Sequence, residues 1–134
     1  MRYILIPKGS VEKSRLTYEY IQYSFHFYKA ARKKLQKIFK NLGKGNVQNI
    51  VFYGVSDLTE IAFISLQETS LQLVAVVDNI KSGEKFLNFG IADPAQLISF
   101  IFDKVVITDM EQRETILDRL RDRRIARNKI VAFD

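Results

Sequence analysis

The sequence contains no cysteine, which excludes disulfide bonds and thiolate metal sites. Its single histidine, His26, has no second histidine or cysteine with which to hold a metal ion, so we expect it to pack among the neighbouring aromatic residues. No apolar run approaches the roughly 18 residues needed to cross a bilayer, and the N-terminus is not a signal peptide. These absences predict a soluble, cytoplasmic protein with neither a metal site nor a membrane partner.

Proline and glycine are scarce, and neither occurs between Ser10 and Gly43. Apolar residues recur there every three or four positions, Ser10 suits an N-cap, and Gly43 suits the residue that ends a helix. We therefore expect a long aromatic-rich helix over residues 10–43. A short strand over residues 1–9 precedes it, and a linker over residues 44–48 follows it.

The first half of this helix is apolar almost all round, because a second stripe (Tyr18, Ile21, Phe25 and Tyr28) joins the first. Such a helix does not stand alone in water. We expect it to pair with the same helix of a second chain and so to form a homodimer. The expected contact residues follow the first stripe: Leu16, Tyr20, Tyr23, Phe27, Leu35 and Ile38.

Charge is divided unevenly along the chain. Residues 1–49 carry eleven Lys and Arg against two Glu, a net charge of +9, whereas residues 50–134 carry ten against thirteen acidic residues, a net charge of −3. A basic arm suits an approach to phosphate backbones. A solvated helix face explains the cluster from Arg32 to Lys40 equally well.

Residues 49–79 have the pattern of a strand, a turn, a helix and a second strand. Apolar runs at Ile50–Tyr53 and Leu71–Val77 flank a helical pattern from about Asp57 to Thr69, and Gly54 breaks the chain between the first run and the helix. Runs that are apolar on both faces are typical of parallel strands buried between helices. This βαβ unit places its first turn where related folds hold a nucleotide phosphate.

That turn keeps one glycine of the dinucleotide fingerprint, because Ser56 and Thr59 stand where the second and third glycines would be. The backbone amides of the helix N-terminus favour an anion, and Asp78, at the end of the second strand, is placed to accept hydrogen bonds from ribose hydroxyls. Gly54 as a simple turn, Asp57 as a helix N-cap and Asp78 as a strand end are the plainer interpretation. The expected ligand residues in this unit are Gly54, Val55, Ser56, Asp57, Leu58, Asp78 and Asn79.

The remaining chain continues as strands and helices. Short strands are expected at residues 86–89, 105–108 and 130–133, a helix after Asp93 and Pro94, and an amphipathic helix over residues 110–121. Residues 49–134 should thus form an α/β domain with a small Rossmann-like parallel sheet in the order 3-2-1-4-5. In that order Thr108 and Asp109 join the ligand crevice.

Two segments carry a resemblance to known families. Residues 3–20, YILIPKGSVEKSRLTYEY, resemble the end of the winged-helix domain in MarR-like regulators found with exopolysaccharide gene clusters, with Ile6 where that pattern has Thr. Residues 53–62, YGVSDLTEIA, and 74–79, VAVVDN, resemble Rossmann-like domains of the CoA-binding type, including those of sugar acyltransferases and nucleotide-sugar dehydratases. The resemblance implies a nucleotide-type ligand, with NAD(H), CoA or a nucleotide sugar as candidates. It also implies that DNA is bound only through a domain not present in this chain.

Catalysis is not expected. No tyrosine has a lysine four positions on, as the Tyr-x-x-x-Lys pair of nucleotide-sugar dehydratases and epimerases requires, and there is no Ser/His/Asp set. We expect the ligand-sensing and dimerisation part of a transcriptional regulator of polysaccharide genes. A ligand-free scaffold and a detached nucleotide-binding half of a nucleotide-sugar-modifying enzyme remain as alternatives.

Overall fold

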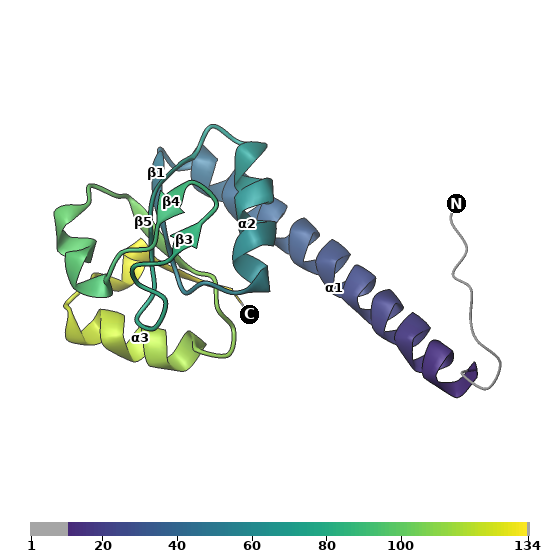
Figure 1. Ribbon diagram of the computed structural model, residues 1–134. Coiled ribbons are helices and arrows are strands. Elements are labelled where there is room, and N and C mark those ends of the chain that lie inside the picture. The colour runs from purple at the N-terminus through teal and green to yellow at the C-terminus, as the bar shows by residue number, and fades with distance from the viewer. Residues whose placement is uncertain (1–10, 134) are drawn as a thin grey trace.

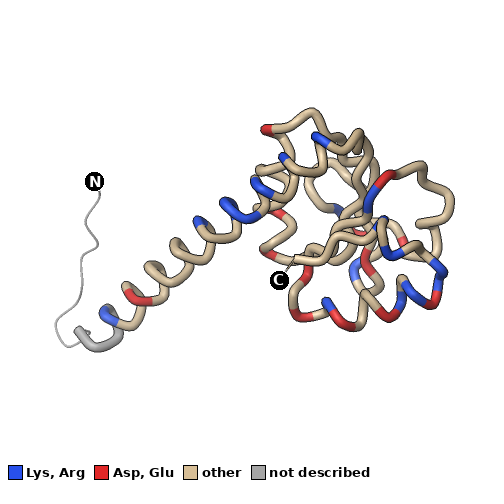
Figure 2. The backbone as a smooth tube through the Cα atoms, turned by 180° about the vertical axis from the view of Figure 1, so that it is seen from behind, with Lys and Arg blue, Asp and Glu red and all other residues tan. Residues whose placement is uncertain are grey.

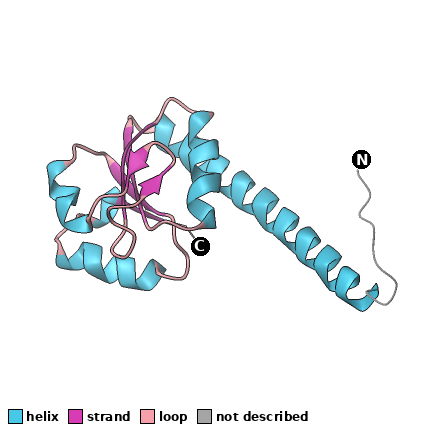
Figure 3. Ribbon diagram, viewed as in Figure 1, coloured by secondary structure: helices cyan, strands magenta, loops and turns pink. Residues whose placement is uncertain are grey.

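The computed structural model describes residues 11–133, with side chains from residue 15, so the strand expected over residues 1–9 and the Ser10 cap lie outside the described residues. Helices and strands follow the expected alternation (Figures 1 and 3). The elements are α1 (Val11–Lys44), β1 (Asn49–Tyr53), α2 (Asp57–Gln67), β2 (Gln72–Val77), β3 (Lys85–Phe86), β4 (Phe89–Gly90), the 3-10 helix η1 (Pro94–Ser99), β5 (Lys104–Ile107), α3 (Arg113–Asp122), the 3-10 helix η2 (Arg127–Lys129) and β6 (Ile130–Ala132).

Four parallel strands form the sheet, in the order β2-β1-β5-β6. Alternate residues of each strand point to opposite faces, and each face has its own apolar core. On one face Ile50, Phe52 and Val106 pack with residues of α1 and α2. On the other face the intervening strand residues pack with Leu97 of η1 and with α3. The two helical layers explain why β1 and β5 are apolar on both faces.

The strand expected at residues 86–89 does not join this sheet. Its residues form the antiparallel hairpin of β3 and β4, in which Leu87 takes a positive φ of 53°. Phe86 and Phe89 place their rings edge-on against Phe63 of α2. Only Ala92, further along, bridges to Val77 of β2, so the five-stranded order 3-2-1-4-5 is not confirmed.

The second half of α1 belongs to the domain core. Ala31, Leu35 and Phe39 are buried, and the ring of Phe39 stacks on that of Phe52 with centroids 6.4 Å apart. Ile38 packs against the same core. Leu35 and Ile38 were expected in the dimer interface, but they contact their own chain because α1 lies along α2 and the sheet.

An ion pair also joins α1 to α2. The Arg32 guanidinium donates to both carboxylate oxygens of Glu68, at 2.5 and 3.0 Å, and Gln36 donates to the same carboxylate at 3.1 Å. The hydrogen bonds from Arg32 and Gln36 lower the pKa of Glu68, and the bond to Glu68 raises the pKa of Arg32. The ion pair lies near the middle of α1, where the helix leaves the domain.

The first half of α1 extends away from the domain (Figure 1). Figure 2 shows an uncharged stretch between Glu19 and Lys29, beyond which basic residues lie close to the domain. Tyr23 is 71% exposed, and the other large apolar residues of both stripes in this half are also exposed: Leu16, Tyr18, Tyr20, Ile21, Phe25, Phe27 and Tyr28. The part of the helix that is apolar all round is therefore the part that the described residues of the domain leave exposed.

Candidate functional site

All the expected ligand residues except Thr108 line a crevice at the carboxyl ends of β1 and β5. The strand order reverses there, because β2 lies on one side of β1 and β5 on the other. The crevice has two adjoining pockets that share Val55, Lys81 and Asp109. The inner pocket encloses about 120 Å³, and Gly54, Asp78 and Asn79 line it together with the shared residues. The outer pocket, of about 420 Å³, is lined by Phe27, Val55, Ser56, Asp57, Leu58, Lys81, Asp109, Met110 and Glu111.

Gly54 makes the sharp turn between β1 and α2. Its φ is 98°, a conformation that glycine adopts at little cost, and its amide donates to the Val77 carbonyl at 2.9 Å. A Cβ at this position would stand 2.6 Å from the Cβ of Asp109 and 3.1 Å from the side chain of Ile116. The glycine thus lets β1 turn directly beneath the segment that follows β5.

Three of the amides expected to hold an anion bind the chain's own oxygens instead. The Val55 amide donates to Asp78 Oδ2 at 2.8 Å, the Ser56 amide to Thr59 Oγ1 at 2.8 Å, and the Leu58 amide to Ser56 Oγ at 3.2 Å. Ser56 is the N-cap and forms a reciprocal capping box with Thr59. Asp57, which the sequence pattern offered as the N-cap, is therefore the first residue of the helix. Ser56 and Thr59, in place of the fingerprint's second and third glycines, thus occupy two of these amides, and Asp78 occupies the third.

Thr108 lies beneath the crevice and does not line it. Its side chain is fully buried, and its hydroxyl donates to the Gly54 carbonyl. Its own carbonyl accepts hydrogen bonds from Ser56 Oγ at 2.7 Å and Thr59 Oγ1 at 3.1 Å. These bonds fasten the end of β5 to the turn after β1, and the buried Thr108 side chain is not exposed to the crevice.

Asp78 is committed to the backbone. Besides the Val55 amide, its carboxylate accepts hydrogen bonds from the amides of Ile80 at 2.8 Å and Lys81 at 2.9 Å, and the residue is 7% exposed. Three of about four lone-pair positions on the carboxylate are thereby used. The Lys81 ammonium in turn donates to the Val55 carbonyl at 2.9 Å. Asp78 therefore ties the β1 turn to the loop after β2, and little of it is left for ribose hydroxyls.

Tyr53 and Arg119 also line the inner pocket. The sequence pattern placed Tyr53 in a strand and Arg119 in the helix expected over residues 110–121, and neither was expected to contact a ligand. The Tyr53 hydroxyl donates to Asn79 Oδ1 at 2.5 Å. Burial raises the pKa of Tyr53, while Arg119 and Arg123 act in the opposite direction. The sequence did contain a signal for Tyr53 as a pocket residue. It is a tyrosine at the end of a buried strand, and its hydroxyl has to reach a hydrogen-bond partner at the sheet edge.

The outer pocket has an acidic rim, because Asp57, Asp109 and Glu111 outnumber the single cation, Lys81. Carboxylates accept hydrogen bonds from hydroxyl groups and repel phosphates. The volume of the outer pocket lies in the usual range for a small-molecule site, whereas the inner pocket is below it. The crevice therefore suits a neutral, hydroxyl-rich group better than a pyrophosphate.

Over residues 11–133 no three His, Cys, Asp or Glu side chains gather as metal ligands. Within the same residues no helix combines the length and hydropathy that a membrane span requires.

The fold and crevice define a three-layer α/β domain with a parallel sheet and a polar site at its carboxyl edge. Residues 46–131 match the family described as C2185-like, N-terminal, and because the match covers well over half of the chain, the protein belongs to that family. The match begins after α1 ends, so the helix precedes the family domain. A search of curated proteins found no match.

Proposed function

We propose that this chain is a non-catalytic dimerisation and ligand-sensing module, the part of a transcriptional regulator of polysaccharide genes that receives a signal. The exposed apolar half of α1 carries the dimerisation part of the proposal. The resemblance of residues 3–20 to the end of a winged-helix domain supports the regulatory setting.

Dimerisation follows from the cost of leaving α1 uncovered. Burying one large apolar side chain stabilises a protein by about 1.5–3 kcal/mol, and eight such residues are exposed between residues 16 and 28. A second α1 offers a matching surface, and residues 20–28 bring no charges that would repel across the interface. Towards the domain, the next basic residue is Lys29, outside the proposed contact.

The test replaces Tyr23 and Phe27 by glutamate in one variant. Sedimentation should give twice the 15.6 kDa chain mass for the unmodified protein and the chain mass for the variant, because four charges would face each other in the dimer. Lys37→Glu, exposed on the buried half of the same helix, should remain dimeric. A monomeric unmodified protein at micromolar concentration would sink the proposal.

Ligand sensing is the second part of the proposal, and the position of Phe27 favours it. Phe27 of α1 lines the outer pocket of the crevice and also the hollow of about 430 Å³ between α1 and α2. A ligand in the outer pocket would contact the helix that forms the dimer. Such a ligand would shift the equilibrium between two arrangements of α1 in the dimer only as far as its affinities for the two arrangements differ. We propose that the sugar or ribose of a nucleotide-type ligand occupies this pocket.

A thermal-shift screen tests this assignment with NAD, NADH, CoA, UDP-sugars and dTDP-sugars. A ligand at about 100 times its Kd adds roughly 2.7 kcal/mol and moves the midpoint by several degrees. The shift should disappear in an Asp57→Asn, Glu111→Gln variant and persist in Glu84→Gln, an exposed change outside the crevice. Inorganic pyrophosphate alone should give no shift. If no compound shifts a dimeric protein, the scaffold alternative replaces sensing.

A further inference from the structure

The two edges of the sheet differ. At the β2 edge, Ala92 donates to the Val76 carbonyl at 2.9 Å and accepts from the Asp78 amide at 3.1 Å, which covers the end of that strand. At the other edge, β6 pairs with β5, and no strand within residues 11–133 pairs with its outer side. All three residues of β6 are only half-buried, in contrast to the buried core residues of β5. The β6 edge is thus open to another strand.

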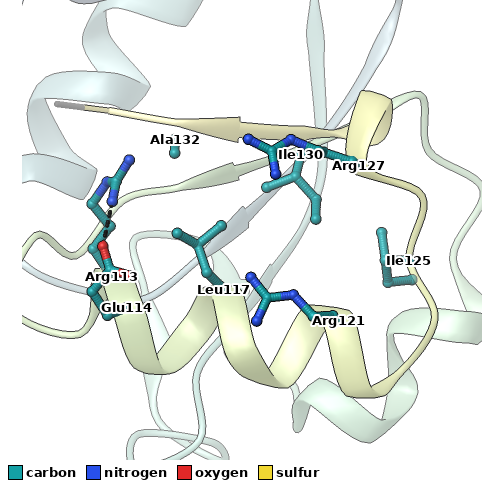
Figure 4. A pocket seen from close by; sticks show the side chains of 8 residues that line it. All are labelled: Arg113, Glu114, Leu117, Arg121, Ile125, Arg127, Ile130 and Ala132. Atoms are coloured by element: carbon teal, nitrogen blue, oxygen red, sulfur yellow. Dashed lines mark hydrogen bonds and ion pairs between the residues drawn. The ribbon is translucent and has the colours of Figure 1, made fainter.

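A groove of about 380 Å³ follows this edge, between β6 and α3 (Figure 4). Its apolar walls are Leu117, Ile125, Ile130 and Ala132. It exists because the buried residues of α3, Ile116 and Leu120, pack with the core around β1 and β5 and leave the flank of β6 uncovered.

Arginines stand at both ends of the groove. Arg113 Nε donates to the Phe133 carbonyl at 3.2 Å, just beyond the end of β6, and Arg127 lies in η2, just before β6 begins. Arg121 extends from the last turn of α3, on the side of the groove opposite Arg127 (Figure 4). The only acid among the lining residues is Glu114, which pairs with Arg113 at 2.6 Å. Arg121 pairs with Asp118 at 3.0 Å, but both side chains are about 70% exposed, so a stronger partner can displace this bond.

We propose that the β6 edge binds an extended acidic segment of another protein, which adds to the sheet as a further strand. Main-chain hydrogen bonds to β6 would hold the segment, and alternate side chains would enter the groove. The preferred pattern is acidic, any, apolar, any, acidic. Residues two apart lie on one face about 6.6 Å from each other, so a central apolar side chain fills the groove while the carboxylates reach arginines at its two ends. A second copy of this chain fits poorly, because it would bring arginines against arginines.

Fluorescence anisotropy with a labelled peptide, GSETVTESG, tests the proposal on the full chain. We expect saturable binding that weakens roughly tenfold in the Arg121→Glu, Arg127→Glu variant, since two charge pairs would become repulsive. Both residues are exposed, so the fold should be retained. The Lys40→Glu, Lys85→Glu variant makes the same change of net charge on surfaces away from the groove and should bind as the unmodified protein does.

Two further peptides separate strand addition from simple attraction of charges. GSETVTESG that is N-methylated on its Thr-Val-Thr residues keeps the charges and side chains but loses amide hydrogens on both edges of the strand, and this peptide should not bind. GSKTVTKSG, with the charges reversed, should not bind either. Equal binding of the N-methylated peptide or no binding of GSETVTESG at about 1 mM would overturn the proposal. Displacement of GSETVTESG by ADP would also overturn it, by assigning the groove to a small anion.

Discussion

Replacing Phe39 by alanine should lower the free energy of unfolding by about 3–5 kcal/mol, the usual cost of deleting a buried aromatic ring. Phe39 is fully buried between α1 and the sheet, and its ring stacks on Phe52 at an interplanar angle of 17°. Its neighbours belong to β1 and to the ordered second half of α1, so they cannot collapse freely into the cavity. The loss of unfolding free energy therefore includes both the lost hydrophobic transfer energy of the ring and the cost of the cavity that the ring leaves.

Urea unfolding followed by far-UV circular dichroism measures this change. Ile98→Ala is the matched control, because Ile98 is 91% exposed on η1 and its truncation should change stability by less than about 0.5 kcal/mol. Similar small effects for both variants would mean that α1 does not pack on the sheet as described. The measurement thus tests whether α1 is fixed to the domain, which any transmission of a signal along the helix requires.

Periodicity predicted the long elements well. The helix expected over residues 10–43 is α1, Val11–Lys44, and the apolar runs of residues 49–79 form β1 and β2. Both patterns persist long enough to reveal which faces are buried. Residues 86–89 offered only four positions, and a hairpin with a positive φ at Leu87 satisfies their apolar residues as well as a sheet strand does.

The same stripe on α1 could not reveal where the chain covers itself. Phe27 and Leu35 are two turns apart on one face, yet Phe27 is 42% exposed and Leu35 is fully buried. The difference arises because α2 and the sheet lie beneath the second half of α1, which makes Leu35 a core residue and leaves Phe27 as a candidate dimer contact. The open groove beside β6 was likewise invisible, because it depends on where α3 crosses the sheet.

For the crevice, the sequence predicted where the turn lies, but not which groups form hydrogen bonds with its backbone amides. Gly54 and the carboxyl edge follow from local pattern and fold class. The Val55 amide binds Asp78, which lies 23 residues further along the sequence. The Gly54 carbonyl binds Thr108, which lies 54 residues further along. Such partners meet through the tertiary fold, so no spacing rule within the turn could identify them.

Replacing Asp78 by alanine should therefore destabilise the domain by about 2–4 kcal/mol, since charge-assisted hydrogen bonds contribute more than neutral ones and three amides lose their acceptor. Part of the loss is recovered where water reaches the amides of the loop after β2. Asp78→Asn should cost less, because its amide oxygen still accepts from one or two of the three donors. Thermal or urea unfolding of the two variants gives the comparison.

The outcome decides how Asp78 should be regarded. A large loss of stability in Asp78→Ala, partly restored in Asp78→Asn, marks a residue that holds the β1 turn to the loop after β2. Unchanged stability with lost ligand binding would instead favour the ribose-binding role, because the carboxylate would then be free to exchange its backbone partners for hydroxyls.

Glu111 provides the reference for this comparison, because it is exposed on the rim of the outer pocket. Glu111→Gln should affect a ligand while leaving the unfolding free energy within about 0.5 kcal/mol. A site for hydroxyl groups built on rim carboxylates, over a turn locked by Asp78, would bind without distorting the domain. Among the residues described, Phe27 is the α1 residue that lines the outer pocket, so the crevice would then pass its occupancy to α1 through Phe27.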